Sequence, residues 1–326
     1  MTRRGEFELI AKLFAPLSKR EPGAFALTDD AAALKPKPGH DIVLTTDAIV
    51  EGVHFLRDDP PETIARKALR VNLSDLAAKG ATPRAYLLTA AFPSWISDDW
   101  LEAFAAGLKA DQKTFGVTLV GGDTVATPGP LTLNVAAIGE VPSGKMLRRA
   151  GAEPGDDVWV SGTIGDAALG LALLKGGPAS LPEKTRSALI ARYRVPEPRA
   201  SLGPLLLAIA HACLDISDGL AADLGHIGEV SKVAIEIQAG DVPLSPAART
   251  VLAAGGTTLS DLLTGGDDYE LAFTAPASSR TRIEALAPKT KVPLTRIGSV
   301  AKGRGVRILA PGGEALPLSR AGYTHF

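Results

Sequence analysis

Aspartates recur directly after short apolar segments of this chain, and that pattern restricts the fold more than any other feature of the sequence. Residues 43–47 read Val-Leu-Thr-Thr-Asp, residues 117–123 read Val-Thr-Leu-Val-Gly-Gly-Asp, and residues 213–218 read Cys-Leu-Asp-Ile-Ser-Asp. Short apolar and β-branched runs followed by Gly, Ser or Asp are typical of buried strands that end in turns. Because strand ends meet at one edge of an open sheet, we expect these aspartates to converge there.

Acidic residues beside Gly or hydroxyl residues at predicted turns are candidate metal ligands, although any one of them alone is more often a turn former. Carboxylates about 4 Å apart repel by roughly 4 kcal/mol at an effective dielectric constant of 20, so a cluster needs counter-charge. Several Mg²⁺ ions that carry a polyphosphate supply it, since Mg²⁺ prefers oxygen ligands. The candidates are Asp29, Asp30, Asp47, Asp123, Asp215, Asp218, Asp267 and Asp268.

The common phosphate-binding loops are absent from the sequence. There is no Gly-x4-Gly-Lys-Ser/Thr loop, no Gly-x-Gly-x-x-Gly after a predicted strand, and no protein-kinase signature. Gly162-Thr-Ile-Gly165 is too short to count, and we interpret it as a packing turn. A phosphate-using protein with this sequence therefore depends on metal ions and acidic side chains rather than on a P-loop lysine.

The periodicity predicts a mixed α/β (α+β) protein of two halves, residues 1–143 and 144–326. In the first half we expect helices at 5–17, 59–80 and 97–115, and strands at 25–34, 41–45, 84–92, 117–123 and 131–141. In the second we expect helices at 166–175, 183–193, 201–211 and 220–230, and strands at 158–160, 213–215, 233–237 and 269–274. Asp75 lies towards the C-terminal end of a predicted helix, where the helix dipole disfavours it, so it needs a second explanation.

Charge and cysteine content exclude several classes of protein. The net charge is −1 and the basic residues are scattered, so neither a nucleic-acid partner nor a membrane surface is indicated. The single cysteine, Cys213, excludes internal disulfides and a Cys-rich zinc site, and its apolar neighbours predict a buried thiol. No signal peptide or membrane-spanning segment is visible, so we expect a cytoplasmic protein.

A set of motifs that runs nearly from end to end resembles the thiamine-monophosphate kinase family. This family belongs to the superfamily of aminoimidazole ribonucleotide synthetase. The motifs are Asp-Asp-Ala-Ala at 29–32, Thr-Thr-Asp at 45–47, Glu-Gly-Val-His-Phe at 51–55, Asn-Leu-Ser-Asp at 72–75, Gly-Gly-Asp-Thr at 121–124, Arg-Ala-Gly-Ala-Glu-Pro-Gly-Asp at 149–156, Asp-Ile-Ser-Asp-Gly-Leu at 215–220, Gly-Gly-Asp-Asp-Tyr-Glu-Leu at 265–271 and Gly-Tyr-Thr-His-Phe at 322–326.

The resemblance implies a reaction and an architecture. It implies direct in-line transfer of the γ-phosphoryl group of ATP, with Mg²⁺, to thiamine monophosphate, which gives thiamine diphosphate. It also implies the two-domain fold of aminoimidazole ribonucleotide synthetase, with mixed sheets flanked by helices. In that fold residues 1–143 bind ATP and Mg²⁺ and residues 144–326 complete the active-site cleft. A homodimer packed through the N-terminal sheets is implied as well.

The resemblance also implies a role for individual residues. The expected Mg²⁺ ligands are Asp30, Thr45, Thr46, Asp47, Asp75, Asp123, Asp215 and Asp218, of which Asp47, Asp75, Asp123 and Asp218 are the expected catalytic residues. The expected ATP contacts are Gly122, Asp123, Arg149 and Ser217. The expected contacts to thiamine monophosphate are His54, Asp267 and Tyr323. A metal site is thus the second explanation for Asp75.

Two departures from the family pattern and two alternative functions stay open at this point. Thr28 stands where the family has Gly, and Asp267 stands where the family often has the longer Glu. One alternative is a related ATP-dependent synthetase that phosphorylates an amide or carbonyl oxygen, although the cysteine features of such relatives are absent. The other is a nucleotide or thiamine-phosphate binding module without turnover, which has no need of so many metal ligands.

Overall fold

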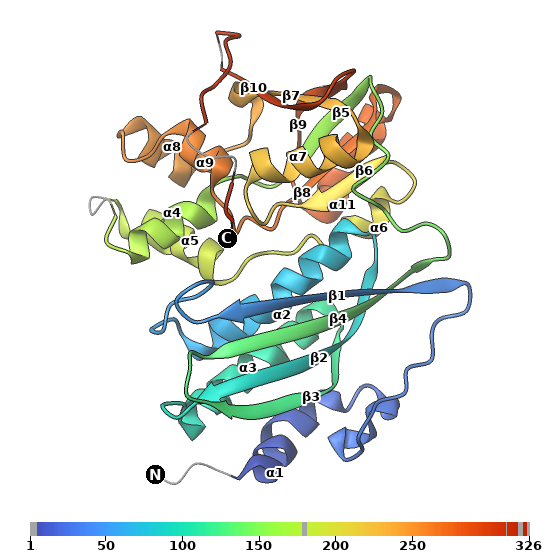
Figure 1. Ribbon diagram of the computed structural model, residues 1–326, viewed down its shortest axis with the longest axis vertical. Coiled ribbons are helices and arrows are strands. Elements are labelled where there is room, and N and C mark those ends of the chain that lie inside the picture. The colour runs from blue at the N-terminus through green and yellow to red at the C-terminus, as the bar shows by residue number, and fades with distance from the viewer. Residues whose placement is uncertain (1–4, 178–180, 311, 319–321, 325–326) are drawn as a thin grey trace. The chain divides into compact units, whose positions relative to one another are not determined.

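The computed structural model describes residues 5–177, 181–310, 312–318 and 322–324 of the chain. These residues form two compact units. The first comprises residues up to Leu76 together with Ala81–Gly144, and the second comprises Ala77–Gly80 and the residues from Lys145 onwards. Each unit contains one mixed sheet with helices packed on it, as the α/β prediction requires (Figure 1).

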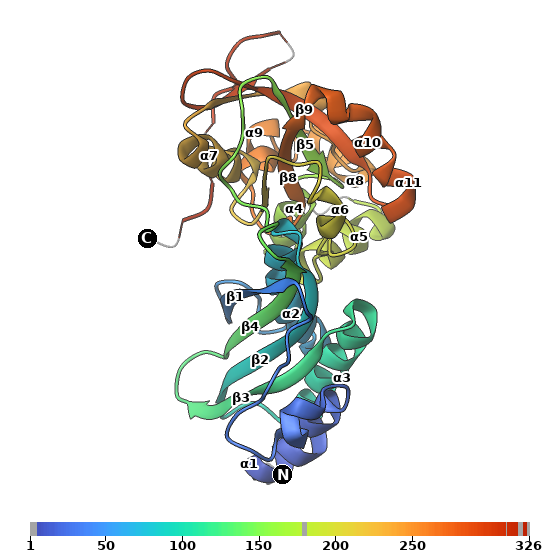
Figure 2. The same ribbon diagram turned by 90° about the vertical axis from the view of Figure 1, so that its right-hand side faces the viewer.

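The first unit is built on a four-stranded sheet in the order β1-β4-β2-β3. Strands β1 and β2 each pair antiparallel with β4, and β3 pairs parallel with β2. Two long helices, α2 and α3, lie on one face of this sheet (Figures 1 and 2). The bounds are β1 His40–Val50, α2 Pro61–Ala78, β2 Thr82–Pro93, α3 Asp98–Phe115, β3 Thr118–Thr127 and β4 Thr132–Pro142.

The local signals of α2 and α3 act as the sequence suggests. The apolar residues that recur at helical spacing in α2 are buried, namely Ile64, Ala68, Val71 and Ala78. Gly80 follows the helix with a φ of 69°, which favours glycine. The Ser97 hydroxyl accepts a hydrogen bond from the N–H of Trp100 and caps α3. Gly116 ends α3 in the left-handed conformation.

The N-terminal segment departs from the prediction in two ways. Residues 5–17 are helical but irregular, as α1 Glu6–Leu9, η1 Ile10–Phe14 and η2 Ala15–Ser18. Phe7 of α1 is 84% exposed. The strand expected at 25–34 is wrong, because the 3₁₀ segment η3 Pro22–Leu27 occupies its start. Phe25 has a φ of 50°, and its carbonyl accepts hydrogen bonds from both the N–H and the hydroxyl of Thr28, so the chain turns.

Two of the strands run on past the polar residues that were expected to follow them. Thr45-Thr46-Asp47 lies inside β1, where Asp47 pairs with Val135 of β4, rather than in a turn after the strand. Gly121-Gly122-Asp123 likewise continues β3. The register between β2 and β3 shifts by one residue between Tyr86 and Leu87, and the two strands stay paired beyond the shift. The prediction of acidic turns at these two places is therefore wrong.

The face of the first sheet that α2 and α3 do not cover carries exposed apolar side chains. Alternation along β1 buries Val43 and Ile49 under the helices and exposes Leu44, of which 71% is accessible, on the other face. The other large apolar residues exposed on the sheet strands are Ile42, Leu87 and Val125. We call this surface the open face.

The second unit contains a six-stranded mixed sheet in the order β10-β7-β9-β5-β8-β6. Helix α7 lies on one face, and α10 and α11 lie on the other (Figure 2). The strands are β5 Asp156–Ser161, β6 Ala212–Asp215, β7 Ala234–Gln238, β8 Leu271–Pro276, β9 Leu294–Ala301 and β10 Gly305–Leu309. The helices are α4 Asp166–Leu174, α5 Glu183–Arg194, α6 Gly203–Leu206, α7 Leu220–Ser231, α8 Pro246–Ala253, α9 Leu259–Thr264, α10 Arg280–Glu284 and α11 Leu286–Thr290; η4 Ala239–Asp241 and η5 Ala277–Ser279 are 3₁₀ turns.

Two predicted elements of this unit differ from the structure. The helix expected at 201–211 is reduced to the short α6, because the N–H of His211 bonds the carbonyl of Thr274 and draws the chain into the sheet. The strand expected from Tyr269 begins only at Leu271, since Tyr269 has a φ of 51°. The remaining strands and helices predicted here are present within a few residues of their expected bounds.

Cys213 is fully buried in β6, and burial raises the pKa of its thiol to about 12. The prediction of an inert buried thiol is confirmed. Among the helices in the described part of the chain, none is both long enough and apolar enough to cross a membrane.

Candidate active site

Oxygen groups of β1 and α2 come together in the first unit. The Thr45 hydroxyl donates a hydrogen bond of 2.5 Å to the Asp75 carboxylate, and the backbone N–H of Asp47 donates one of 2.9 Å to the Asn72 side-chain oxygen. Asn72 is fixed in turn by its amide, which donates to the carbonyl of Ala68. Asp75 therefore holds α2 against the middle of β1, and this contact is a structural reason for an acid near the end of the helix.

Thr46 and Asp123 do not share this position. Thr46 lies on the open face, where its hydroxyl and the side chain of Asn134 are hydrogen-bonded. Asp123 pairs through Thr89 with Asn134, so it also points to the open face, whereas Asp47 pairs with buried Val135 on the covered face. The predicted convergence of Asp47 and Asp123 at one sheet edge is therefore wrong.

Their separation follows from the strand order. Asp47 lies on β1 and Asp123 on β3, which are opposite edge strands of the sheet, and β4 and β2 lie between them. Three strand spacings of about 4.8 Å put their backbones roughly 14 Å apart. That distance is too long for one Mg²⁺ ion to be bound by both carboxylates of the same chain, because ligand oxygens lie at about 2.1 Å from this ion.

His54 lies in a tight turn that follows β1. Its Nδ1 accepts a hydrogen bond of 3.0 Å from the N–H of Val50, so the neutral ring carries its proton on Nε2. The carbonyl of His54 accepts a hydrogen bond from buried Lys67 of α2. The turn is thus held at both its side chain and its backbone. Asp30 and Gly122 are exposed, the first in the loop after η3 and the second within β3.

The predicted residues of the second unit gather around the loop 215–219. Asp215 is the buried last residue of β6, and Ser217 and Asp218 follow in the loop. The Ser217 carbonyl accepts the N–H of Asp267 at 2.8 Å, and the Asp218 carbonyl accepts the N–H of Tyr323 at 3.0 Å. The structure therefore brings four residues expected at the nucleotide and at the acceptor into one group.

Arg149 lies apart from this group along α7. Its carbonyl accepts a hydrogen bond from Ser231, the last residue of the helix, whereas Ser217 and Asp218 precede the first turn. The Arg149 side chain is exposed. The Arg149 backbone thus lies beside the C-terminal end of α7, whereas the loop 215–219 precedes its N-terminal end.

Asp223 and His226 of α7 are polar residues of this region that sequence reasoning missed. One potential ligand atom from each of Asp218, Asp223 and His226 lies within 4.8 Å of the others. Burial of Asp223, together with the charge of Asp218, raises the pKa of the Asp223 carboxyl to about 7. The sequence does contain a signal for Asp223. It follows Gly219 by four residues, so in a helix that begins at Leu220 its side chain lies in the first turn and reaches back to the preceding loop.

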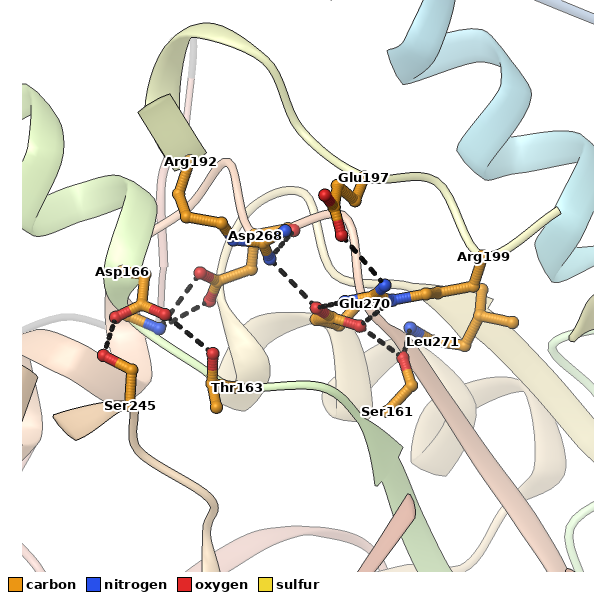
Figure 3. Close-up of polar contacts among 11 residues, drawn as sticks. Ser161, Thr163, Asp166, Arg192, Glu197, Arg199, Ser245, Asp268, Glu270 and Leu271 are labelled. Carbon is orange, nitrogen blue, oxygen red and sulfur yellow. Dashed lines mark hydrogen bonds and ion pairs between the residues drawn. The ribbon is translucent and has the colours of Figure 1, made fainter. Parts of the chain in front are cut away.

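The loop that carries Asp267 is held on its other side by a buried network of charges (Figure 3). Glu270 is fully buried, and its carboxylate accepts hydrogen bonds from Arg192 at 2.9 Å, from Arg199 and from the hydroxyl of Ser161. Asp268 accepts the backbone N–H of Gly165 at 2.9 Å, and burial raises the pKa of Asp268 well above its usual range.

This network places Asp267 in a conformation that an L-residue rarely adopts. Asp267 has a φ of 70° and its neighbour Tyr269 a φ of 51°, and the Tyr269 hydroxyl donates to the Asp267 carboxylate. Backbone strain of this kind persists only when surrounding contacts fix it. The buried contacts of Asp268 and Glu270, which flank Tyr269 in the chain, supply that support.

We expect Glu270→Ala to lower the free energy of unfolding by about 3–5 kcal/mol, because two arginines then lose their buried counter-charge. The measurement is urea unfolding followed by circular dichroism. Glu236→Ala is the matched control, since Glu236 forms an exposed ion pair with Arg307, and we expect it to cost about 1 kcal/mol or less. Equal losses in the two variants would contradict the role of Glu270.

The donor atoms of both groups fit a hard divalent cation. They are hydroxyl and carboxylate oxygens, as in the pair Thr45 and Asp75, and the carboxylates of Asp47 and Asp123 are exposed. Mg²⁺ prefers such ligands and retains several waters. The Cys213 thiol lies two residues from Asp215 in β6, but it is fully buried.

The chain is similar to thiamine-monophosphate kinases in both sequence and structure. Residues 28–141 match the family model described as AIR synthase related protein, N-terminal domain. A thiamine-monophosphate kinase of Caulobacter vibrioides is 41% identical over 98% of this chain and 90% of its own length. The crystal structure of thiamine-monophosphate kinase from Stenotrophomonas maltophilia K279a is 44% identical, with a TM-score of 0.82 over 89% of this chain and 91% of that one. AaThiL complexed with AMPPCP and TMP is 32% identical, with a TM-score of 0.79 over the whole of both chains.

Proposed function

Since the chain belongs to the thiamine-monophosphate kinase family, we propose that it transfers the γ-phosphoryl group of ATP to the phosphate of thiamine monophosphate. The observation that carries this proposal is the pair of oxygen-rich groups, one around β1 and α2 and one around the loop 215–219. A relative of the same fold and full length binds AMPPCP and TMP, which are an ATP analogue and the acceptor. We propose that each unit contributes residues to this one reaction.

The acceptor is itself a phosphate oxygen, which is nucleophilic at neutral pH without a strong base. The protein must therefore bring two anions together in line and stabilise the charge of the transferred group. We propose a direct transfer in which Asp47, Asp75 and Asp123 hold the cations on the phosphates and Asp215 and Asp218 add ligands from the second unit. Bound Mg²⁺ supplies Lewis-acid charge stabilisation for this transfer.

For the other candidate residues we propose the roles that the family resemblance implies. Ser217 and Gly122, together with Arg149 and Asp30, act at the nucleotide and its cations. His54, Asp267 and Tyr323 act at thiamine monophosphate, for which His54 offers the Nε2–H as a donor. Asp267 is shorter than Glu by one methylene, and the left-handed backbone of its loop sets where its carboxylate lies.

We further propose a homodimer formed through the open face. Exposed apolar side chains on one face of a sheet mark an interaction surface. A two-fold axis parallel to the strands would place β1 of one copy, with the exposed Asp47 on this edge strand, opposite β3 and Asp123 of the other copy. In this proposal each site takes Asp47 from one subunit and Asp123 from its partner.

Leu44→Asp is expected to convert the dimer to a monomer, because it buries two unpaired carboxylates at a two-fold interface. Sedimentation velocity at micromolar concentration measures the change. Ile138 lies opposite Leu44 on β4, and Leu44→Val is the matched control that keeps the apolar contact. A dimer that persists in Leu44→Asp would contradict the proposed interface.

A panel of acceptors tests the proposed reaction. With ATP and Mg²⁺, thiamine monophosphate should yield equal amounts of thiamine diphosphate and ADP, and thiamine should yield no product because it has no phosphate. Turnover of amide or carbonyl substrates instead would identify a synthetase of the same superfamily. Tight binding of both ligands without product would identify a binding module.

A further inference from the structure

Three backbone N–H groups of one loop converge on a single carboxylate oxygen of α7. Asp223 Oδ2 accepts hydrogen bonds from Ser217 at 3.1 Å, from Asp218 at 3.0 Å and from Gly219 at 3.1 Å. The residue is only 2% exposed, so water does not compete effectively for these donors. A carboxylate that accepts several backbone N–H groups fixes the conformation of the peptide that supplies them.

The carbonyl groups of the same loop hold two other segments of the chain. Ser217 accepts the N–H of Asp267, and Asp218 accepts the N–H of Tyr323. The carbonyl of Ile216 accepts the N–H of Tyr269. The backbone of the loop therefore holds the two segments that carry Asp267 and Tyr323, the residues proposed to contact the acceptor, and its own side chains are those proposed for the nucleotide and its cations.

Close packing makes this connection stiff. A Cβ on Gly266 would lie 2.4 Å from the carbonyl oxygen of Ser217, and one on Gly322 would lie 2.8 Å from that of Asp218. Gly219, with a φ of 120°, lies against the backbone of Thr264 in the same way. Since no space separates these backbones, a displacement of the loop must displace the segments that carry Asp267 and Tyr323.

We propose that Asp223 is a positioning residue that sets the nucleotide side and the acceptor side of the site together through the loop 215–219. The inference rests on the proposed function, and it adds a residue that acts through Ser217, Asp218, Asp267 and Tyr323. Loss of the Asp223 acceptor leaves three N–H groups, all in a partly or fully buried loop, without their partner, so the loop must move to find new acceptors.

Asp223→Ala and Asp223→Asn together test the role. The asparagine keeps a side-chain oxygen that accepts the three N–H groups, whereas alanine has none. We expect Asp223→Ala to raise KM for both ATP and thiamine monophosphate by roughly tenfold, which is the effect of losing one to two hydrogen bonds. We expect Asp223→Asn to keep both KM values close to those of the unmodified protein. Asp157→Asn is the control, since Asp157 is a buried aspartate of the same unit that pairs with Arg280 away from the loop.

Amide hydrogen exchange gives a readout that does not depend on turnover. In Asp223→Ala, the amides of Asp267 and Tyr323 should exchange roughly tenfold faster together with those of residues 217–219, because each loses the anchored carbonyl that it bonds. Asp157→Asn should leave all of them unchanged. If Asp223→Ala does not fold, Asp223→Ser, whose hydroxyl is too short to reach all three donors, takes its place.

Two results would overturn the proposal. One is faster exchange confined to residues 217–219 with Asp267 and Tyr323 unchanged, and the other is a rise in KM for only one of the substrates. If the unmodified protein forms no thiamine diphosphate, the proposed function fails, but the exchange of Asp267 and Tyr323 still decides whether Asp223 holds them.

Discussion

Asp47→Asn should lower kcat for thiamine diphosphate formation by about a thousandfold or more, which corresponds to roughly 4 kcal/mol of lost transition-state stabilisation. Asparagine has the shape of aspartate but lacks the charge that holds a cation on the phosphates. The fold should persist, because Asn72 binds the backbone N–H of residue 47, which the substitution keeps. Steady-state kinetics at saturating Mg²⁺, with circular dichroism of the same samples, measure both quantities.

A control for this substitution lies on the same strand. Asp41 is an exposed carboxylate near the start of β1 that accepts the N–H of Gly144, and this hydrogen bond lowers the pKa of Asp41. Asp41→Asn removes one charge from the strand without touching the candidate site, so its kcat should stay within about twofold of the unmodified value. Equal activity in Asp47→Asn and in the unmodified protein would contradict the role of Asp47.

Mixed dimers of two inactive variants should recover activity. If each site takes Asp47 from one subunit and Asp123 from the other, a dimer of one Asp47→Asn and one Asp123→Asn chain has one site with both defects. Its second site is intact. Heterodimers isolated through two different affinity tags should therefore show about half the kcat of the unmodified dimer, against about a thousandth for either variant alone.

The alternative arrangement gives the opposite result. If Asp47 and Asp123 act from the same chain, every site in the heterodimer contains one defect and no activity returns. Heterodimers of Asp47→Asn with Asp75→Asn are the control, since Asp75 lies beside β1 of its own chain through Thr45. Each site in that heterodimer contains one defect, so no activity should return. Recovered activity in this control would show that the assay does not report on the sharing of residues between subunits.

Much of the fold could be predicted because its local signals agree with its tertiary contacts. Helix α3 begins after the Ser97 cap and ends at Gly116, as capping rules require. The strands with clear alternation, β2 and β4, lie within two residues of their predicted bounds. The buried stripe of α2 follows from its spacing alone.

The departures arise where contacts distant in sequence decide the local structure. Gly121-Gly122 resembles a turn, yet pairing with β2 keeps it in a strand. Residues 25–34 resemble a strand, yet left-handed residues turn the chain. The expected acidic rim assumed that strand ends meet, and only the loop 215–219 conforms, whereas Asp47 and Asp123 lie on opposite faces and edges of one sheet.

Label transfer from ATP tests the central claim most directly. ATP that carries ¹⁸O in its γ-phosphoryl group is incubated with the protein, Mg²⁺ and thiamine monophosphate, and the products are analysed by mass spectrometry. The proposed transfer predicts thiamine diphosphate with three ¹⁸O atoms from the non-bridging positions in its terminal phosphate, and unlabelled ADP. No thiamine diphosphate, or thiamine diphosphate without the label, would contradict it.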